Sequence, residues 1–190
     1  DDTMVLADLK NLTITTASAN SGSGATITLP NIDGTAGDGN DGTDLTINAA
    51  SATVNLESID NDINDLQVTG GTIKLGGNIT TAAHNPGTGA DAAQITLTGN
   101  VELEAATITL TSGNGDVTLS AKVDSESGEN RALVIDSGSG DVAINGAVGT
   151  TTALGNLSIN DGTGGATGAG DITLLPSSLP INSSCFSGDL

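Results

Sequence analysis

The stretch NIDGTAGDGNDGTDLTI, residues 31–47, concentrates acidic and amide side chains in a glycine-rich loop. It contains Asp33, Asp38, Asn40, Asp41 and Asp44, whose side-chain oxygens are the hard ligands that Ca²⁺ prefers. The spacing does not fit an EF-hand loop, and glycine-rich calcium repeats need tandem copies, whereas this chain has one. The loop is therefore a candidate Ca²⁺ site, and the alternative is a solvated insertion between strands.

The basic residues are too few and too scattered to predict a catalytic centre. Lys10, Lys74, Lys122 and Arg131 are the only Lys or Arg residues, although a β-helical enzyme acting on acidic sugars needs such a group as its base. His84, the single histidine, lies in the turn TAAHNPGTGAD and reads as a solvated loop residue. We therefore expect no catalysis, and a β-helical polysaccharide-degrading enzyme is the least favoured alternative.

The charge balance excludes whole classes of function. The chain of 190 residues has 23 Asp or Glu and four Lys or Arg, which gives a net charge of −19. A nucleic-acid-binding protein would carry a basic stripe, and no stretch approaches the length of a membrane span.

Cys185 is the single cysteine, so no internal disulfide stabilises the fold. The chain begins with Asp1 and Asp2 rather than Met, as expected of a processed form or a segment of a longer protein.

Apolar residues alternate with Thr, Ser, Asn or Asp in many short segments along the chain. A period of two is typical of β-strands, and Thr and β-branched residues favour strands, whereas Gly favours turns. No window of helical spacing competes with this alternation, so the sequence predicts an all-β fold. Expected strands include NLTIT (11–15), DLTIN (44–48), AQITLTGNVELE (93–104), ATITLTS (106–112) and GDVTLSAKV (115–123).

These segments also resemble one another at a larger scale. ALVIDSGSGDVAINGAV (132–148) echoes ATITLTSGNGDVTLSAKV (106–123), and NLSINDGTGGATGAGDITLL (156–175) repeats the scheme with a longer turn. Strand, Gly-rich turn, strand, turn and short strand, repeated over roughly 20–30 residues, is typical of a parallel β-solenoid or β-helix. We expect about seven rungs around a narrow aliphatic core, because the chain has one Phe and no Trp or Tyr. A Greek-key β-sandwich is the alternative.

Three residues indicate how successive rungs are joined. Asn48, Asp136 and Asn160 each directly follow an L-x-I or L-V-I strand, at the first position of a turn. Equivalent positions of successive rungs stack about 4.8 Å apart, so such side chains can bond along the stack and satisfy backbone groups of the turns. We therefore predict a structural Asx ladder at these positions.

The stretch GDVAINGAVGTTTALGNLSIN (140–160), with GDVTLSAKV and GDITL in matching roles, resembles the repeats of large secreted bacterial proteins of the filamentous-haemagglutinin type. The resemblance is clearest over residues 92–175. It implies a right-handed β-helix that projects an adhesive surface from a bacterial cell. The NPNG-like motifs of that family's secretion domain do not occur here, and HNPGTG (84–89) does not replace them.

The repeat pattern covers residues 11–175 and breaks at both ends. We expect residues 1–10 to form an N-terminal strand, cap or linker, and residues 176–190 a C-terminal tail or cap. A solenoid exposes a strand edge at each end unless a cap covers it, and such an edge can also accept a strand from a neighbouring copy.

Together these features favour an extracellular structural or adhesive protein, a stiff β-solenoid segment of a bacterial surface adhesin or fibre. A self-assembling extracellular filament subunit, joined by terminal strand addition, is the alternative. Expected partners are copies of itself or neighbouring repeats end to end, and host or cell-surface glycans or proteins. We expect neither nucleic-acid binding nor membrane insertion, and no required cofactor beyond the candidate Ca²⁺.

Overall fold

The computed structural model describes residues 3–7, 11–16, 24–35, 43–60, 63–82, 93–159 and 170–174. This part of the chain contains sixteen β-strands and no helix, which confirms the predicted all-β class. The strands follow the alternation of apolar and polar residues. In β5 (Thr43–Asn48), for example, every second side chain is buried, because successive residues of a strand point to opposite sides.

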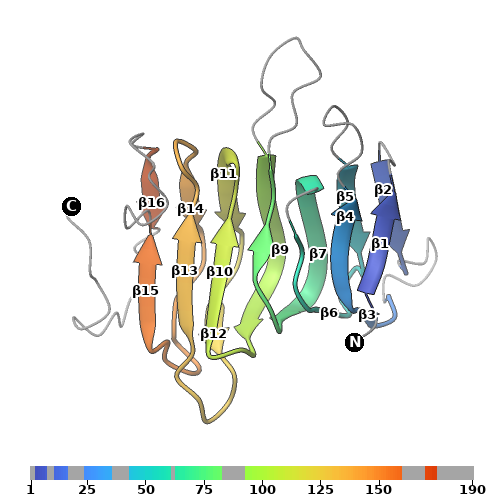
Figure 1. Ribbon diagram of the computed structural model, residues 1–190. Coiled ribbons are helices and arrows are strands. Elements are labelled where there is room, and N and C mark those ends of the chain that lie inside the picture. The colour runs from blue at the N-terminus through green and yellow to red at the C-terminus, as the bar shows by residue number, and fades with distance from the viewer. Residues whose placement is uncertain are drawn as a thin grey trace.

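The strands lie on three faces of an elongated coil (Figure 1). The principal face contains, in spatial order, β2 (Asn11–Thr15), β5, β7 (Ile63–Leu75), β9 (Ala93–Leu103), β11 (Asn114–Leu119), β14 (Val142–Ile144) and β16 (Ile172–Leu174). The second face contains β1 (Thr3–Ala7), β4 (Asn31–Thr35), β8 (Ile79–Thr80), β10 (Thr107–Thr111), β13 (Ala132–Asp136) and β15 (Asn156–Ile159), with Ile59 bridging β4 and β8. The third face contains β3 (Ile27–Leu29), β6 (Thr53–Leu56), the second halves of β7 and β9, and β12 (Val123–Ser125).

Every strand pair in the described residues is parallel, and each strand pairs with a strand from the next level of the coil. The chain therefore winds as a β-solenoid of about five turns, and the predicted solenoid is confirmed. Seven strands follow one another along the principal face, but the turns are fewer than the seven rungs predicted. The alternative of a Greek-key sandwich is wrong, since that fold needs antiparallel pairs.

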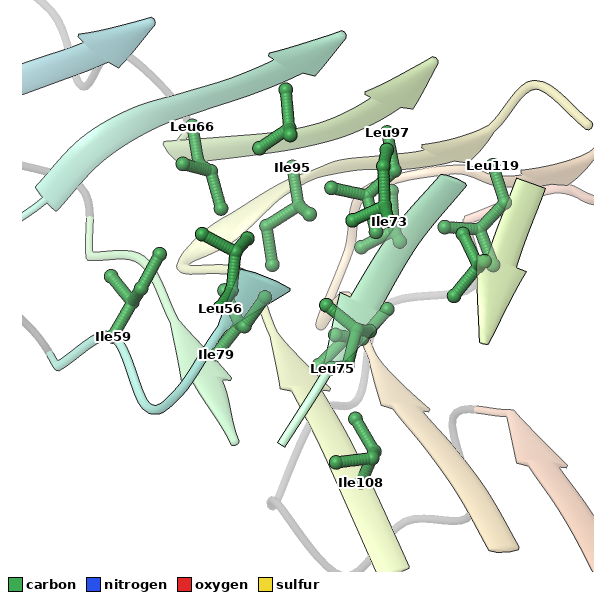
Figure 2. Packing of buried hydrophobic residues seen from close by; sticks show 14 of the residues in the cluster. Leu56, Ile59, Leu66, Ile73, Leu75, Ile79, Ile95, Leu97, Ile108 and Leu119 are labelled. Carbon is green, nitrogen blue, oxygen red and sulfur yellow. The ribbon is translucent and has the colours of Figure 1, made fainter. Parts of the chain in front are cut away.

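Aliphatic side chains stack in columns inside the coil. On the principal face Leu45, Leu66, Ile95 and Val117 occupy equivalent positions, and each is at most 1% exposed. Figure 2 shows Leu66 and Ile95 pointing into the space that also holds residues from the other two faces. Those facing residues include Leu56, Ile59, Ile73, Leu75, Ile79 and Ile108. Branched aliphatics thus fill the interior along the described part of the coil.

Glycine permits the sharp bend between the principal and third faces. β7 and β9 both run through this bend and contribute to both faces. Gly99 has a φ of 145°, and a Cβ at that position would overlap the carbonyl oxygen of Gly70 on the neighbouring level. A Cβ at Gly71 would likewise overlap the carbonyl oxygen of Ser51. Successive levels are therefore so close at this corner that a side chain would push them apart.

The first strand of the chain is part of the solenoid. β1 lies within the segment 1–10 that was expected to form a strand, cap or linker, and it pairs in parallel with β4. Residues 176–190, the expected tail or cap, lie outside the described residues.

Candidate functional site

The acidic loop of the predicted Ca²⁺ site begins and ends on two different faces. Asp33 is an exposed residue of β4 on the second face. Asp44 is a half-buried residue of β5 on the principal face, where its Oδ1 accepts a hydrogen bond from the Asn64 side-chain amide at 3.2 Å. Asp38, Asn40 and Asp41 lie outside the described residues. Ca²⁺ binding by this set therefore stays a prediction.

The described residues contain no other cluster of the side chains that commonly bind metal ions. Among them, no three or more His, Cys, Asp or Glu side chains come together in a way that could hold a metal ion. Lys10, His84 and Cys185 also lie outside the described ranges, so nothing is derived from them.

The predicted Asx ladder is wrong for Asn48 and Asp136, which lie on different faces. Asn48 belongs to the principal face and lies in register with Thr15 and Thr69, whereas Asp136 belongs to the second face and lies in register with Thr111. The two side chains cannot stack, because they lie on different faces. The L-x-I pattern occurs on both faces and therefore does not distinguish them. Each instead closes its own turn: Asn48 Oδ1 accepts the N–H of Ala50 at 2.9 Å, and Asp136 Oδ1 accepts the N–H of Gly138 at 3.2 Å. Asn160 is not among the described residues.

A different ladder joins the levels, at the corner that leads into the principal face. Asp116 Oδ1 accepts the backbone N–H of Asp141 at 2.8 Å, and Asp141 Oδ1 accepts the backbone N–H of Asp171 at 2.8 Å. Asp65 Oδ1 accepts the N–H of Gln94 at 2.9 Å in the same way, further toward the N-terminus. Each carboxylate thus satisfies a backbone donor of the following level.

The turn that precedes this ladder explains why the sequence Ser-Gly-x-Gly-Asp recurs. Ser137 is fully buried, and its Oγ donates to the carbonyl oxygen of Gly140 at 2.7 Å, while Ser112 makes the equivalent bond to Gly115. A Cβ at Gly140 would overlap the carbonyl of Gly115 one level away. We call residues 112–116 and 137–141 the Gly-Asp corners. The repeated GDV and GDI motifs marked them in the sequence, but not the bond between levels.

The described basic residues all lie on or beside the third face, in ion pairs. The Lys74 ammonium group lies 2.6 Å from Glu104 Oε1 and 3.2 Å from Glu102 Oε1. Hydrogen bonds to Glu104 and Glu102 raise the pKa of Lys74 above its usual range. Arg131 Nη2 donates to Glu126 Oε2 at 2.9 Å. Pairs this exposed to solvent contribute little to stability individually.

Asp124 differs because its residue is only 5% exposed. Its Oδ2 lies 2.8 Å from Lys122 Nζ, and its Oδ1 accepts the N–H of Thr151 at 2.9 Å and, at 3.4 Å, the N–H of Thr152. Burial alone would raise the pKa of this carboxyl, but the hydrogen bonds from Lys122, Thr151 and Thr152 outweigh burial and lower it below 3.8. Asp124 therefore anchors the chain of the next level as a buried, ionised carboxylate.

Neither a protein-family model, nor a curated protein, nor a solved structure matches this chain. The resemblance to filamentous-haemagglutinin-type repeats thus stays a prediction. Within the described ranges, no helix has the length and apolar character needed to cross a bilayer.

Proposed function

We propose that the chain is a stiff structural segment of an extracellular bacterial adhesin or fibre, which acts by holding its faces at a fixed distance from the cell. One observation carries this proposal. Columns of buried aliphatic residues continue from level to level along the solenoid, as Leu45, Leu66, Ile95, Val117 and Val142 do on the principal face. A core of this shape gives an elongated molecule whose length is set by the number of levels.

The bonds between levels support a mechanical role. Parallel backbone hydrogen bonds join neighbouring levels on all three faces, and the Asp116–Asp141–Asp171 ladder adds side-chain bonds in the same direction. A force that bends or shears the rod has to break several of these bonds together. The surplus of Asp and Glu over Lys and Arg keeps such a rod soluble and prevents lateral association.

Small-angle X-ray scattering and electron microscopy of the purified protein test the proposal. A particle with one long axis and a narrow cross-section, present as separate short rods, is the expected result. A compact, isotropic particle would overturn it. Robust turnover of acidic or neutral polysaccharides would favour the enzyme alternative instead, and should be assayed on the same sample.

A filament subunit is the second candidate, and the two ends of the coil favour it. In the described residues β1 and β2 lie at one end of their faces, and β15 and β16 lie at the other. Val5 on β1 is 55% exposed and Ile172 on β16 is 47% exposed, which makes them the exposed large apolar residues in the part of the chain that the structure describes. Because each level has a similar cross-section, one end can continue the strands of the other in a head-to-tail contact that does not close.

Electron microscopy over a range of protein concentrations separates the two candidates. Fibres that lengthen with concentration, and that disappear in the variants Val5→Lys and Ile172→Lys, would favour the filament subunit. Thr107→Lys, at an exposed position of β10 in the interior of the second face, is the matched control. Single rods at every concentration favour the structural segment.

A further inference from the structure

The outward side of the principal face carries a regular grid of uncharged residues, most of them threonine. Two columns make up this grid, and we call them the threonine grid. The first column contains Thr13, Thr46, Gln67, Thr96, Thr118, Ala143 and Thr173, which lie in register on successive strands. The second column, two residues further along each strand, contains Thr15, Asn48, Thr69 and Thr98. All of these residues are exposed or half-buried.

The threonine grid carries no charge, although the chain has a net charge of −19. The charged residues are placed beside it. The column that borders the grid, two residues before the first column, holds Asp65, Asp116, Asp141 and Asp171. The outward column of the third face holds Lys74, Glu102 and Asp124. An uncharged strip in so acidic a protein fits a ligand that is neutral and rich in hydrogen-bonding groups.

The geometry of the grid favours a ligand that is itself periodic. Outward residues repeat about 4.8 Å apart between levels and roughly 6.6 Å apart along a strand, since each residue of a parallel strand advances about 3.3 Å. Threonine is β-branched and stiff about χ1, so its hydroxyl and methyl groups hold fixed positions on the strand. The coil beneath keeps the strands in register, and Figure 1 shows them side by side along the long axis. The surface of hexagonal ice is likewise an uncharged array of hydrogen-bonding groups that repeats in two directions.

We propose that the threonine grid binds the surface of ice. The hydroxyl groups would join the hydrogen-bonded lattice, and the methyl groups would order the water between them and exclude liquid-like water from the contact. A crystalline polysaccharide is the other periodic, neutral surface with the right polarity. It is less well matched, because sugar rings are commonly held by aromatic side chains and the grid has none. The proposal does not depend on the role of the rod as a spacer.

The test measures thermal hysteresis, the gap between the melting point of an ice crystal and the temperature at which it grows. The wild-type protein should show such a gap, and the variant Thr118→Lys should lose it, because a lysine within the first column of the grid keeps its hydration and breaks the lattice contact. The matched control is Thr109→Lys. Thr109 is also a half-buried, outward-facing threonine, but it lies on β10 in the second face. The control should keep the wild-type gap.

A second variant covers the case in which Thr118→Lys does not fold, as judged by circular dichroism and melting temperature. Thr118→Ser keeps the hydroxyl group and loses the methyl group and the stiff rotamer, so it should narrow the gap. Absence of hysteresis in the wild type, or equal loss in Thr109→Lys, overturns the proposal, as does adsorption to microcrystalline cellulose without any effect on ice. A rod-shaped scattering profile from the same sample shows whether the proposed structural role survives that result.

Discussion

The carboxylate of Asp116 accepts a hydrogen bond from the backbone N–H of Asp141, one level further along the coil, at 2.8 Å. Asp141 repeats the relationship with Asp171. Both bonds are made by side chains where the principal-face strands begin, so the position of one level over the next is fixed at the corner as well as by the backbone bonds of the sheets.

Replacing Asp116 by Ala removes the acceptor and should lower the free energy of unfolding by about 1 kcal/mol. Asp116→Asn keeps an oxygen acceptor and removes a negative charge near Asp141, so it should be at least as stable as the wild type. Chemical denaturation of the three proteins measures the difference. Equal destabilisation by Ala and Asn would mean that the charge, rather than the hydrogen bond, matters at this position.

Gly140 should not tolerate a side chain. A Cβ at this position would overlap the carbonyl of Gly115, which is backbone and cannot rotate away. Gly140→Ala should therefore destabilise the fold by about 1–3 kcal/mol, as overpacking usually does. Ser139→Ala changes the exposed neighbour in the same turn and should stay within about 0.5 kcal/mol of the wild type. Thermal melts compare the two, and a neutral Gly140→Ala would show that the levels can separate there.

The buried columns should be the main source of stability. Leu97 is fully buried in β9, and Leu97→Ala should cost about 2–5 kcal/mol through lost burial and the cavity left behind. Thr96→Ala, at the neighbouring outward position, should cost less than about 1 kcal/mol. Urea denaturation of both variants measures the contrast. Similar losses at the two positions would contradict the assignment of inward and outward sides.

Asp124 should make stability depend on pH in a defined direction. Its pKa is lower in the folded protein than the 3.8 of an unperturbed Asp, so the unfolded chain binds a proton at a higher pH than the folded chain does. The contribution of this carboxylate is therefore complete above the unfolded pKa and is lost as pH falls through the folded pKa.

The difference in unfolding free energy between the wild type and Asp124→Asn isolates this term, because repulsion among the other carboxylates is common to both proteins. The wild type should be the more stable protein at pH 7, and the difference should shrink as the pH is lowered below about 4. A difference that is constant from pH 7 to pH 2 would contradict an ionised Asp124 in the folded state.

The predicted Ca²⁺ site of Asp33, Asp38, Asn40, Asp41 and Asp44 is tested by melting temperature. Ca²⁺ should raise the transition temperature if the loop binds the ion in the folded state only, and a chelator should reverse the shift. Mg²⁺ at the same concentration controls for ionic strength. An unchanged transition temperature in all three conditions would contradict Ca²⁺ binding by these residues.

The sequence predicts which side of each strand is buried, because a period of two directly reports the two sides of a strand. Leu45 and Ile47 were expected to alternate with Thr46 and Asn48, and they do. The repeated GDV and GDI motifs likewise predicted equivalent positions, and Val117, Val142 and Ile172 are in register. The period does not report which face a strand joins. The prediction that Asn48 and Asp136 stack failed for this reason.

Asp124 could not be predicted from its neighbours. In the sequence Val-Asp-Ser it occupies an outward position, and an outward Asp is ordinarily solvated. It is buried because Thr151 and Thr152 of the next level, whose N–H groups it binds, cover it, and they are 27 and 28 residues away. The one local signal was Lys122, two residues earlier, which pairs with its carboxylate. Contacts at such separations depend on the path of the whole turn.

The aspartates of the ladder are joined across unequal lengths of chain: 25 residues separate Asp116 from Asp141, and 30 separate Asp141 from Asp171. The same junction therefore accepts segments of different size. In evolutionary terms, a gene encoding such a protein can gain or lose one whole repeat by recombination and still join correctly on both sides. Rods of different length can therefore descend from one ancestor without any change in the contacts between neighbouring repeats.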